Sequence, residues 1–213
     1  MANFLPVGVA SKTSMVITTR KNDSRFKTVG EFIAFAKANP GRINCGHAGP
    51  GTPNHLAILQ MENAAGIQLS AVAYKGSGPA LVDLLGGTLD AVFDQISSSM
   101  PHFKAGNLQA LAVLGPQPEA LLPGVPTLAQ SGLPEFDSTT YAGLLLPAGT
   151  PPAVVGTLGA ALKKALADPQ MNASLKELGS SVYDADAAAF SRMLVSEDQL
   201  ATAMVRDGKL KSD

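Results

Sequence analysis

The residues with the most chemical potential in this sequence lie in one short stretch, CGHAGPGTPNHL, at positions 45–56. It holds a cysteine, two histidines and three glycines directly before an apolar run. Such a stretch could bind an anion, hold a metal ion, supply a thiol nucleophile or simply turn the chain. These four roles make different demands on the residues around it.

The glycine loop at 46–52 suits a small anion better than a nucleotide. It lies between an expected strand and an expected helix, where free backbone N–H groups and the helix dipole attract negative charge. Glycines let the backbone approach a ligand and present successive N–H groups. The pattern G-x-x-G-x-G-T matches neither the dinucleotide motif nor the P-loop, and no lysine follows it. A tight turn whose Thr52 only caps the helix explains the same residues equally well.

The histidines and the cysteine allow two weaker hypotheses. His47, His55 and His102 could form a three-histidine zinc site, but no cysteine or carboxylate cluster supports them, so we expect no metal. We expect His55 to bond a loop carbonyl near the helix start. Cys45 and His47 could act as nucleophile and base, but no third group that would orient them is evident. A small buried cysteine is the simpler interpretation.

Two further stretches place polar groups at the ends of expected strands. YKGSGPAL (74–81) again puts glycines at a helix start, and Lys75 could add positive charge. VFDQISS (92–98) ends a strand at Asp94. The Asp94 carboxylate either faces a cleft or caps the next helix, and both interpretations remain open.

The composition excludes several classes of protein. The 213 residues are 46% apolar and 15% charged, which predicts a packed core. Sixteen basic and seventeen acidic residues, without tryptophan, argue against a nucleic-acid partner. One cysteine excludes an internal disulfide. No apolar stretch reaches membrane-spanning length, and the N-terminus lacks the pattern of a signal peptide.

Strand and helix patterns alternate through the first half of the chain. Thr28 and Glu31 have the spacing of a capping box, and Thr52, Pro53 and Gly66 mark the start and end of another helix. This alternation predicts an α/β domain over 11–113 with a mostly parallel sheet covered on both faces. The expected strands are SMVITTR, RINCG, IQLSAVAYKG, LDAVFD and LQALAVL.

The second half of the chain has a different pattern. Residues 115–137 are rich in proline and predict an irregular connection with one helical turn at TLAQSG. A strand at 138–147 follows. Three helices come next, and they begin near Pro151, at Asp168-Pro169 and near Asp186. This half contains too few strands to form a complete sheet.

Five motifs in one order resemble a known family. They are AGPGTPNHL, YKGSGPALVDLLGGTLDAVFD, MPHFKAGNLQALAV, LPGVPTLAQSGLPEF and LLLPAGTPPAVV. Together they resemble the substrate-binding proteins of tripartite tricarboxylate transporters, the TctC-like or Bug family, from Phe4 to about Leu210. The resemblance implies a periplasmic, non-enzymatic, cofactor-free receptor with a type II periplasmic-binding-protein fold. Its partners would be a small carboxylate (a tricarboxylate, a dicarboxylate or an acidic amino acid) and membrane transporter subunits.

The resemblance also implies which residues meet the ligand. The glycine loop would grasp a carboxylate through backbone N–H groups, with Asp94 near the cleft and Tyr141 near the interface between the lobes. His47 stands where the family commonly has serine, so binding could depend on pH. The implied ligand-binding residues are His47, Ala48, Gly49, Gly51, Thr52, Asp94 and Tyr141.

The same resemblance predicts how the chain divides. Residues 1–10 would be a crossover segment, 11–113 a complete lobe, and 114–213 part of an incomplete, helix-rich lobe, with hinges near 8–12 and 113–116. The family's preceding segment, with a second glycine-rich loop, is expected to be absent. Helices at 151–206 would then need a partner, for example a second copy. Two alternatives stay open: a truncated remnant that binds nothing, and an enzyme that uses Cys45, His47 and Asp94.

Overall fold

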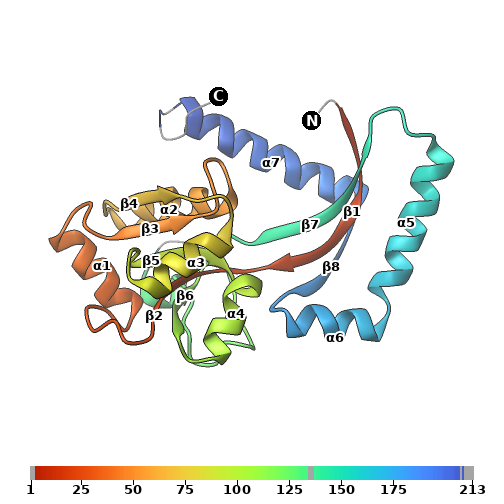
Figure 1. Cartoon of the computed structure of the whole chain (residues 1–213). Coiled ribbons are helices and arrows are strands. Elements are labelled where there is room, and N and C mark those ends of the chain that lie inside the picture. The colour runs from red at the N-terminus through yellow and green to blue at the C-terminus, as the bar shows by residue number, and fades with distance from the viewer. Residues whose placement is uncertain (1–2, 134–136, 207, 209–213) are drawn as a thin grey trace. The chain divides into compact units, whose positions relative to one another are not determined.

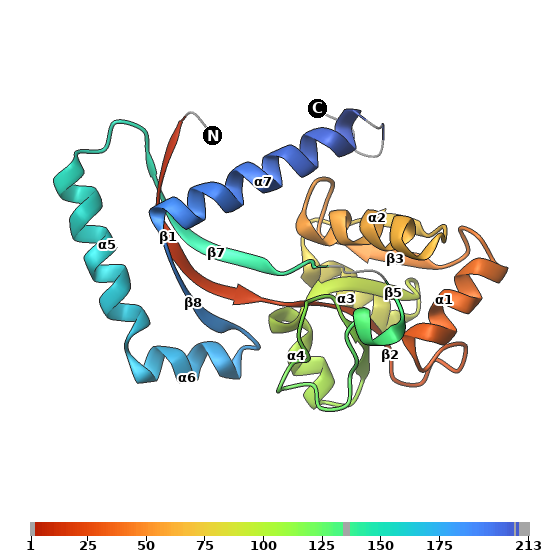
Figure 2. The same ribbon diagram turned by 180° about the vertical axis from the view of Figure 1, so that it is seen from behind.

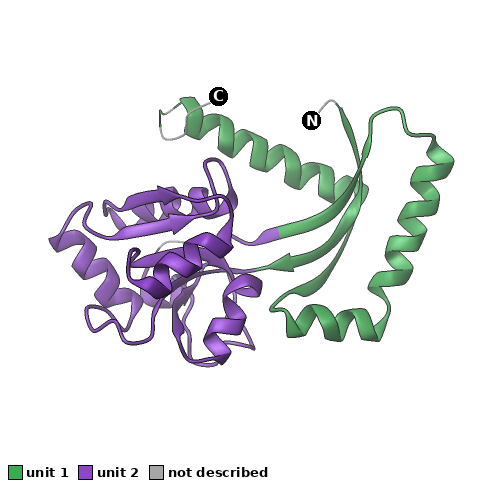
Figure 3. Cartoon of the chain, in the orientation of Figure 1, with its two compact units in different colours: residues 1–13, 141–213 green, residues 14–140 purple. Residues whose placement is uncertain are grey.

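The computed structural model describes residues 3–133, 137–206 and 208, and the chain forms two compact units. Unit 2 is the continuous segment 14–140, and unit 1 combines residues 1–13 with 141–213 (Figure 3). Residues 114–140, which the sequence analysis grouped with the C-terminal half, therefore belong to unit 2. Leu114 and Leu128 are buried in its main core. The assignment of these units to receptor lobes stays a prediction.

Unit 2 is built on a five-stranded sheet in the order β4-β3-β5-β2-β6 (Figure 1). The strands β3, β4 and β5 are parallel, but β2 runs antiparallel to both β5 and β6. The expectation of a mostly parallel sheet is wrong at β2. Met15 pairs with Gln95, so β2 starts where β5 ends and must run in the opposite direction. The strands are β2 (Met15–Arg20), β3 (Asn44–His47), β4 (Ser70–Ala73), β5 (Ala91–Gln95) and β6 (Leu108–Val113).

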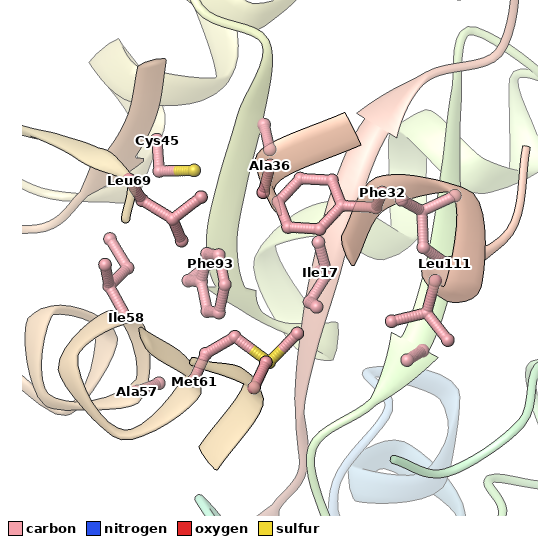
Figure 4. Packing of buried hydrophobic residues seen from close by; sticks show 14 of the residues in the cluster. Ile17, Phe32, Ala36, Cys45, Ala57, Ile58, Met61, Leu69, Phe93 and Leu111 are labelled. Carbon is pink, nitrogen blue, oxygen red and sulfur yellow. The ribbon is translucent and has the colours of Figure 1, made fainter. Parts of the chain in front are cut away.

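Four helices cover both faces of this sheet. The helices α1 and α2 share one face, where Phe32, Met61 and Phe93 pack together (Figure 4). The helix α3 packs on the other face, where Leu84 contacts the same cluster as Val92, and Ile96 and Met100 of α4 join a further cluster. Because alternate residues of a strand point to opposite faces, Val92 and Phe93 serve different layers. The helices are α1 (Val29–Ala38), α2 (Pro53–Ala65), α3 (Ser77–Gly86) and α4 (Ile96–Lys104).

The helix-start signals in the sequence are confirmed in unit 2. Thr28 and Glu31 form a reciprocal capping box at the start of α1. Thr52 caps α2, Pro53 occupies its first turn, and Gly66 ends it in the left-handed conformation. The irregular segment contains one short 3₁₀ turn at Ala129–Ser131, as expected.

Unit 1 contains a three-stranded sheet in the order β7-β1-β8, in which β1 and β8 are antiparallel (Figure 2). Local sequence patterns predict β7 but neither β1 nor β8. Their pairing joins opposite ends of the chain, with Gly8 opposite Asp186, so no local pattern reveals it. The elements are β1 (Phe4–Thr13), β7 (Thr140–Pro147), α5 (Pro152–Leu166), α6 (Pro169–Glu177), β8 (Ser181–Asp186) and α7 (Ala187–Arg206).

The core of unit 1 is small. Val9, Leu166 and Phe190 are among its few buried apolar side chains, whereas Leu144 and Leu145 on β7 are 37% and 39% exposed. Among the described helices of the whole chain, none combines the length and hydropathy needed to cross a bilayer.

Candidate functional site

Three helices of unit 2 begin at the same edge of its sheet. Parallel strands end on one side, and α2, α3 and α4 start directly after β3, β4 and β5. Helix starts carry unpaired N–H groups and partial positive charge, so this edge favours an anion. Thr52 caps α2, but α3 and α4 have no side-chain cap. The Ile96 N–H at the start of α4 donates to the Ser14 carbonyl at 3.1 Å, so the N–H groups proposed for a ligand are the remaining first-turn groups of α3 and α4.

Hydrogen bonds join the three helix starts into one structure. The Gly76 N–H before α3 donates to the Ala48 carbonyl in the glycine loop, at 3.1 Å. Asn54 in the first turn of α2 donates from Nδ2 to the Phe93 carbonyl on β5, at 2.8 Å. Ser77 at the start of α3 donates to Asp94, also on β5, at 2.6 Å. The glycine loop, the turn before α3 and the end of β5 thus form a connected edge.

The glycine loop has a backbone that only glycine adopts readily. Gly49 and Gly51 have φ angles of 133° and 72°, in the region that L side chains avoid. The Thr52 hydroxyl donates to the Gly49 carbonyl at 2.7 Å and accepts from the His55 N–H. The hydrogen of this hydroxyl is therefore already hydrogen-bonded inside the loop. The capping role of Thr52 is confirmed, and its contact with a ligand stays a prediction.

The rings of the two histidines in the glycine loop and at the start of α2 stack on each other. The rings of His47 and His55 lie 4.3 Å apart between centroids and 14° from parallel. His47 Nδ1 lies 2.9 Å from the Gly49 carbonyl oxygen, and His55 Nδ1 accepts from the Gly51 N–H at 3.3 Å. The expectation that His55 bonds a loop carbonyl is therefore wrong, because its ring nitrogen meets an N–H group instead.

Burial favours the neutral form of both rings. Desolvation lowers the pKa of His47 against an opposing hydrogen bond to Gly49, and it lowers the pKa of His55 together with the nearby His47 ring. Neutral imidazoles support the loop as packed, hydrogen-bonding groups. No group of three or more His, Cys, Asp or Glu side chains within the described residues is placed to hold a metal ion.

Cys45 is a core residue of unit 2. The strand β3 continues through His47, so both side chains point to the face covered by α2. Figure 4 shows Cys45 beside Leu69 in this core. Burial raises the pKa of the Cys45 thiol, which leaves the thiol protonated and poorly nucleophilic. The surroundings of Cys45 therefore do not activate its thiol as a nucleophile.

Asp94 lies at the centre of a set of serine hydroxyls. Its fully buried carboxylate accepts from Ser77 at 2.6 Å and from Ser98 and Ser99 at 2.7 Å each. Of the two interpretations left open for Asp94, the cap of α4 is wrong, because Gln95 occupies that position. The three serines were not predicted from the sequence. The run Ser97-Ser98-Ser99 shortly after Asp94 was the available signal, since a buried carboxylate needs nearby donors.

Tyr141 belongs to unit 1 rather than to this edge. Its ring lies 5.4 Å from that of Tyr183, between centroids, and it is 38% exposed. Its role at a ligand stays a prediction. In unit 2 hydrogen bonds connect Ala48 with the turn before α3 and Asp94 with the starts of α3 and α4, whereas Thr52 bonds within the glycine loop.

Comparisons with known proteins agree with this architecture. Residues 3–210 match the family described as "Tripartite tricarboxylate transporter family receptor", TctC. The periplasmic binding protein BugD is 30% identical, with a TM-score of 0.87 over 98% of this chain and 71% of that one. MatC from Rhodopseudomonas palustris with bound malate is 27% identical, with a TM-score of 0.85 over 93% of this chain and 69% of that one. The predicted periplasmic-binding-protein class of fold is confirmed.

A curated relative from Pseudomonas sp. (strain P51) shows the extent of the match. This UPF0065 protein from the tcbD–tcbE intergenic region is 32% identical over 212 residues. The alignment covers 99% of this chain but 63% of the relative. The chain therefore spans less than two thirds of the length of that relative.

Proposed function

Because the chain belongs to the TctC family of tripartite tricarboxylate transporter receptors, we propose that it binds a small carboxylate and presents it to membrane transporter subunits. The ligand classes are tricarboxylates, dicarboxylates and acidic amino acids. The receptor would act in the periplasm without a cofactor and without chemical turnover. The bound malate of MatC, at 27% identity, agrees with this ligand class.

The observation that carries this proposal is the meeting of three helix starts at one sheet edge. Each helix start stabilises a nearby negative charge by about 0.3–1 kcal/mol at an exposed site. Two of the three helices, α3 and α4, leave their first-turn N–H groups without a side-chain cap. Backbone donors of this kind suit a carboxylate, whose two oxygens accept several hydrogen bonds.

We assign different roles to the proposed site residues. The backbone of Ala48, Gly49 and Gly51 would face the carboxylate. His47 and Thr52 would hold the loop in shape, since their side chains bond within it. Asp94 would organise the starts of α3 and α4, and Tyr141 would contribute from unit 1.

A thermal-shift screen tests the proposal directly. The chain is melted with citrate, with C4 and C5 dicarboxylates, and with aspartate and glutamate. A ligand at 100 times its dissociation constant adds about 2.7 kcal/mol to the free energy of unfolding. We expect at least one acid to raise the melting temperature. A cooperative melt that no acid shifts would support the alternative of a folded chain that binds nothing.

Matched glycine variants locate the binding site. Gly51 and Gly41 have nearly equal φ angles of 72° and 69°, and an added Cβ meets no atom within 4 Å at either position. Alanine at either position should therefore lower the free energy of unfolding by a similar amount, about 1 kcal/mol. Only Gly51→Ala should weaken binding of the acid found in the screen. Equal binding by both variants would place the ligand elsewhere.

The proposal also includes self-association through unit 1. Tyr141, Leu144 and Leu145 on β7 are each more than a third exposed, which is a large apolar exposure for one strand. A second copy of the chain is the partner that we propose for this strand.

A further inference from the structure

The serine hydroxyls at the proposed site already donate hydrogen bonds within the protein. Ser77 at the start of α3 and Ser98 in the first turn of α4 both donate to the Asp94 carboxylate. A serine hydroxyl has one proton and two lone pairs. Ser98 Oγ also lies 3.1 Å from the Gln95 carbonyl, which competes for the same proton. The two hydroxyl oxygens therefore offer only lone pairs to any further partner.

The two serines that carry these oxygens, unlike Asp94, are partly exposed. Ser77 and Ser98 are half-buried, whereas Asp94 and Ser99 are fully buried. Ser99 also lies 3.3 Å from Thr18 Oγ1, on the inner side of the network. Ser77 directly follows Gly76, whose N–H contacts the glycine loop. The hydroxyl oxygens thus belong to the same edge as the backbone donors.

We infer that this site distinguishes two parts of its ligand, a carboxylate and a hydrogen-bond donor beside it. The inference rests on the proposed function. Backbone N–H groups at the helix starts take the carboxylate. Ser77 and Ser98 accept from a ligand hydroxyl or ammonium group, and donation to Asp94 polarises their oxygens into better acceptors. A second carboxylate oxygen at this position would face lone pairs and the buried negative charge of Asp94.

The ligand class is therefore a carboxylate with a hydroxyl or amino substituent. Succinate, malate and aspartate form a matched set, since they share a four-carbon diacid chain and carry hydrogen, hydroxyl or ammonium at one carbon. One neutral hydrogen bond contributes about 1 kcal/mol, so malate should bind roughly fivefold more tightly than succinate. The ammonium group of aspartate is a charged donor, so aspartate should gain at least as much as malate. Comparison of malate with aspartate shows whether the site prefers a hydroxyl or an ammonium group as the donor. Glutarate, 2-hydroxyglutarate and glutamate extend the set to longer diacids.

The Asp94→Asn variant tests the cause of this preference. The asparagine amide donates a hydrogen bond, so at least one serine becomes the acceptor and its proton is free to meet a ligand carboxylate. Calorimetric titration should show the ratio of malate to succinate affinity falling toward one. Asp83→Asn is the matched control, because Asp83 accepts from the Tyr74 hydroxyl at 2.6 Å in the same unit. The control should keep the wild-type ratio.

A second variant covers the case in which Asp94→Asn fails to fold. Ser98→Ala removes one acceptor and should weaken malate more than succinate. Equal affinities within each matched set, in the wild-type chain, would overturn the inference and leave carboxylate binding intact. Failure of every acid to bind would overturn the proposed function, and the inference with it.

Discussion

The stacked His47 and His55 rings show how single residues shape the glycine loop. His55 Nδ1 accepts from the Gly51 N–H, and this contact requires an unprotonated nitrogen. Protonation would remove that acceptor and place two cations face to face at 4.3 Å. The loop is therefore more stable while both rings are neutral.

This arrangement predicts that acid destabilises unit 2. Burial lowers the pKa of both histidines in the folded state, below the value of about 6.5 in the unfolded chain. The unfolded state then binds more protons as the pH falls. Their contribution to the free energy of unfolding should be complete above about pH 6.5 and should decrease as the pH falls toward the folded-state pKa values. Urea unfolding at pH 7.5 and 5.5 measures this loss.

Variants assign the loss to the loop. His47→Gln and His55→Gln should each reduce the difference in stability between the two pH values. His102→Gln removes an imidazole from α4, outside the loop. If that control reduced the difference as much as the loop variants, the explanation would fail.

Among the elements of unit 2, the helices α1 and α2 both begin with a threonine N-cap. Thr28 forms a capping box with Glu31 at the start of α1, and Thr52 caps α2 in the glycine loop. Both hydroxyls satisfy a backbone N–H that the helix leaves unpaired. Only the second cap also fixes the glycine loop, through the Gly49 carbonyl.

The two threonines therefore give a matched test at this level. Thr28→Ala and Thr52→Ala should each lower the free energy of unfolding by about 1 kcal/mol, the usual loss for a missing cap. Thr52→Ala should also weaken carboxylate binding, whereas Thr28→Ala should not. Denaturant unfolding and ligand titration of both variants measure the two effects. A Thr52→Ala variant that binds as the wild type does would show that this cap has no role in binding.

At the level of the whole molecule, the two units differ in how well they are packed. Unit 2 buries Phe26, Phe32 and Phe93 completely in the cluster on one face of its sheet, and further clusters of buried residues include α3 and α4. Unit 1 exposes apolar side chains on β7 and on α5, where Val154 is 44% exposed. Exposed apolar patches of this kind mark surfaces that associate.

We predict that the chain associates through unit 1. Sedimentation velocity should show a sedimentation coefficient that rises with protein concentration. Leu144→Glu should shift the chain toward the monomer. Val82→Glu is the control, because Val82 is 66% exposed on α3 in unit 2. A monomer at all concentrations, with no binding of a hydrophobic dye, would contradict the prediction.

Local sequence patterns were sufficient for most elements of unit 2. The capping box at Thr28, the Thr52-Pro53 start of α2 and the stop at Gly66 each depend only on residues close together in the sequence. The strands β1 and β8 were missed because their pairing depends on residues far apart in the chain. The direction of β2 was missed because it depends on where the chain enters the sheet.

The site was predicted only in part for the same reason. The glycine loop and its cap are visible as a local pattern. The serine network around Asp94 joins Ser77 with Ser98 and Ser99 on two different helices, so only the fold brings them together. The stacking of His47 on His55 likewise depends on how α2 follows β3.

The pairing of β1 with β8 also sets an order of events in folding. β1 is synthesised before unit 2, but its partner Ser181–Asp186 is made only after all of unit 2. Closing so long a chain segment is entropically unfavourable and slow. Folding of unit 2 shortens that segment, because Gly115 lies against both Ser14 and Thr139, near the two ends of the unit. Unit 2 would thus act as the nucleus on which unit 1 closes, and a mutation that delays unit 2 would delay both.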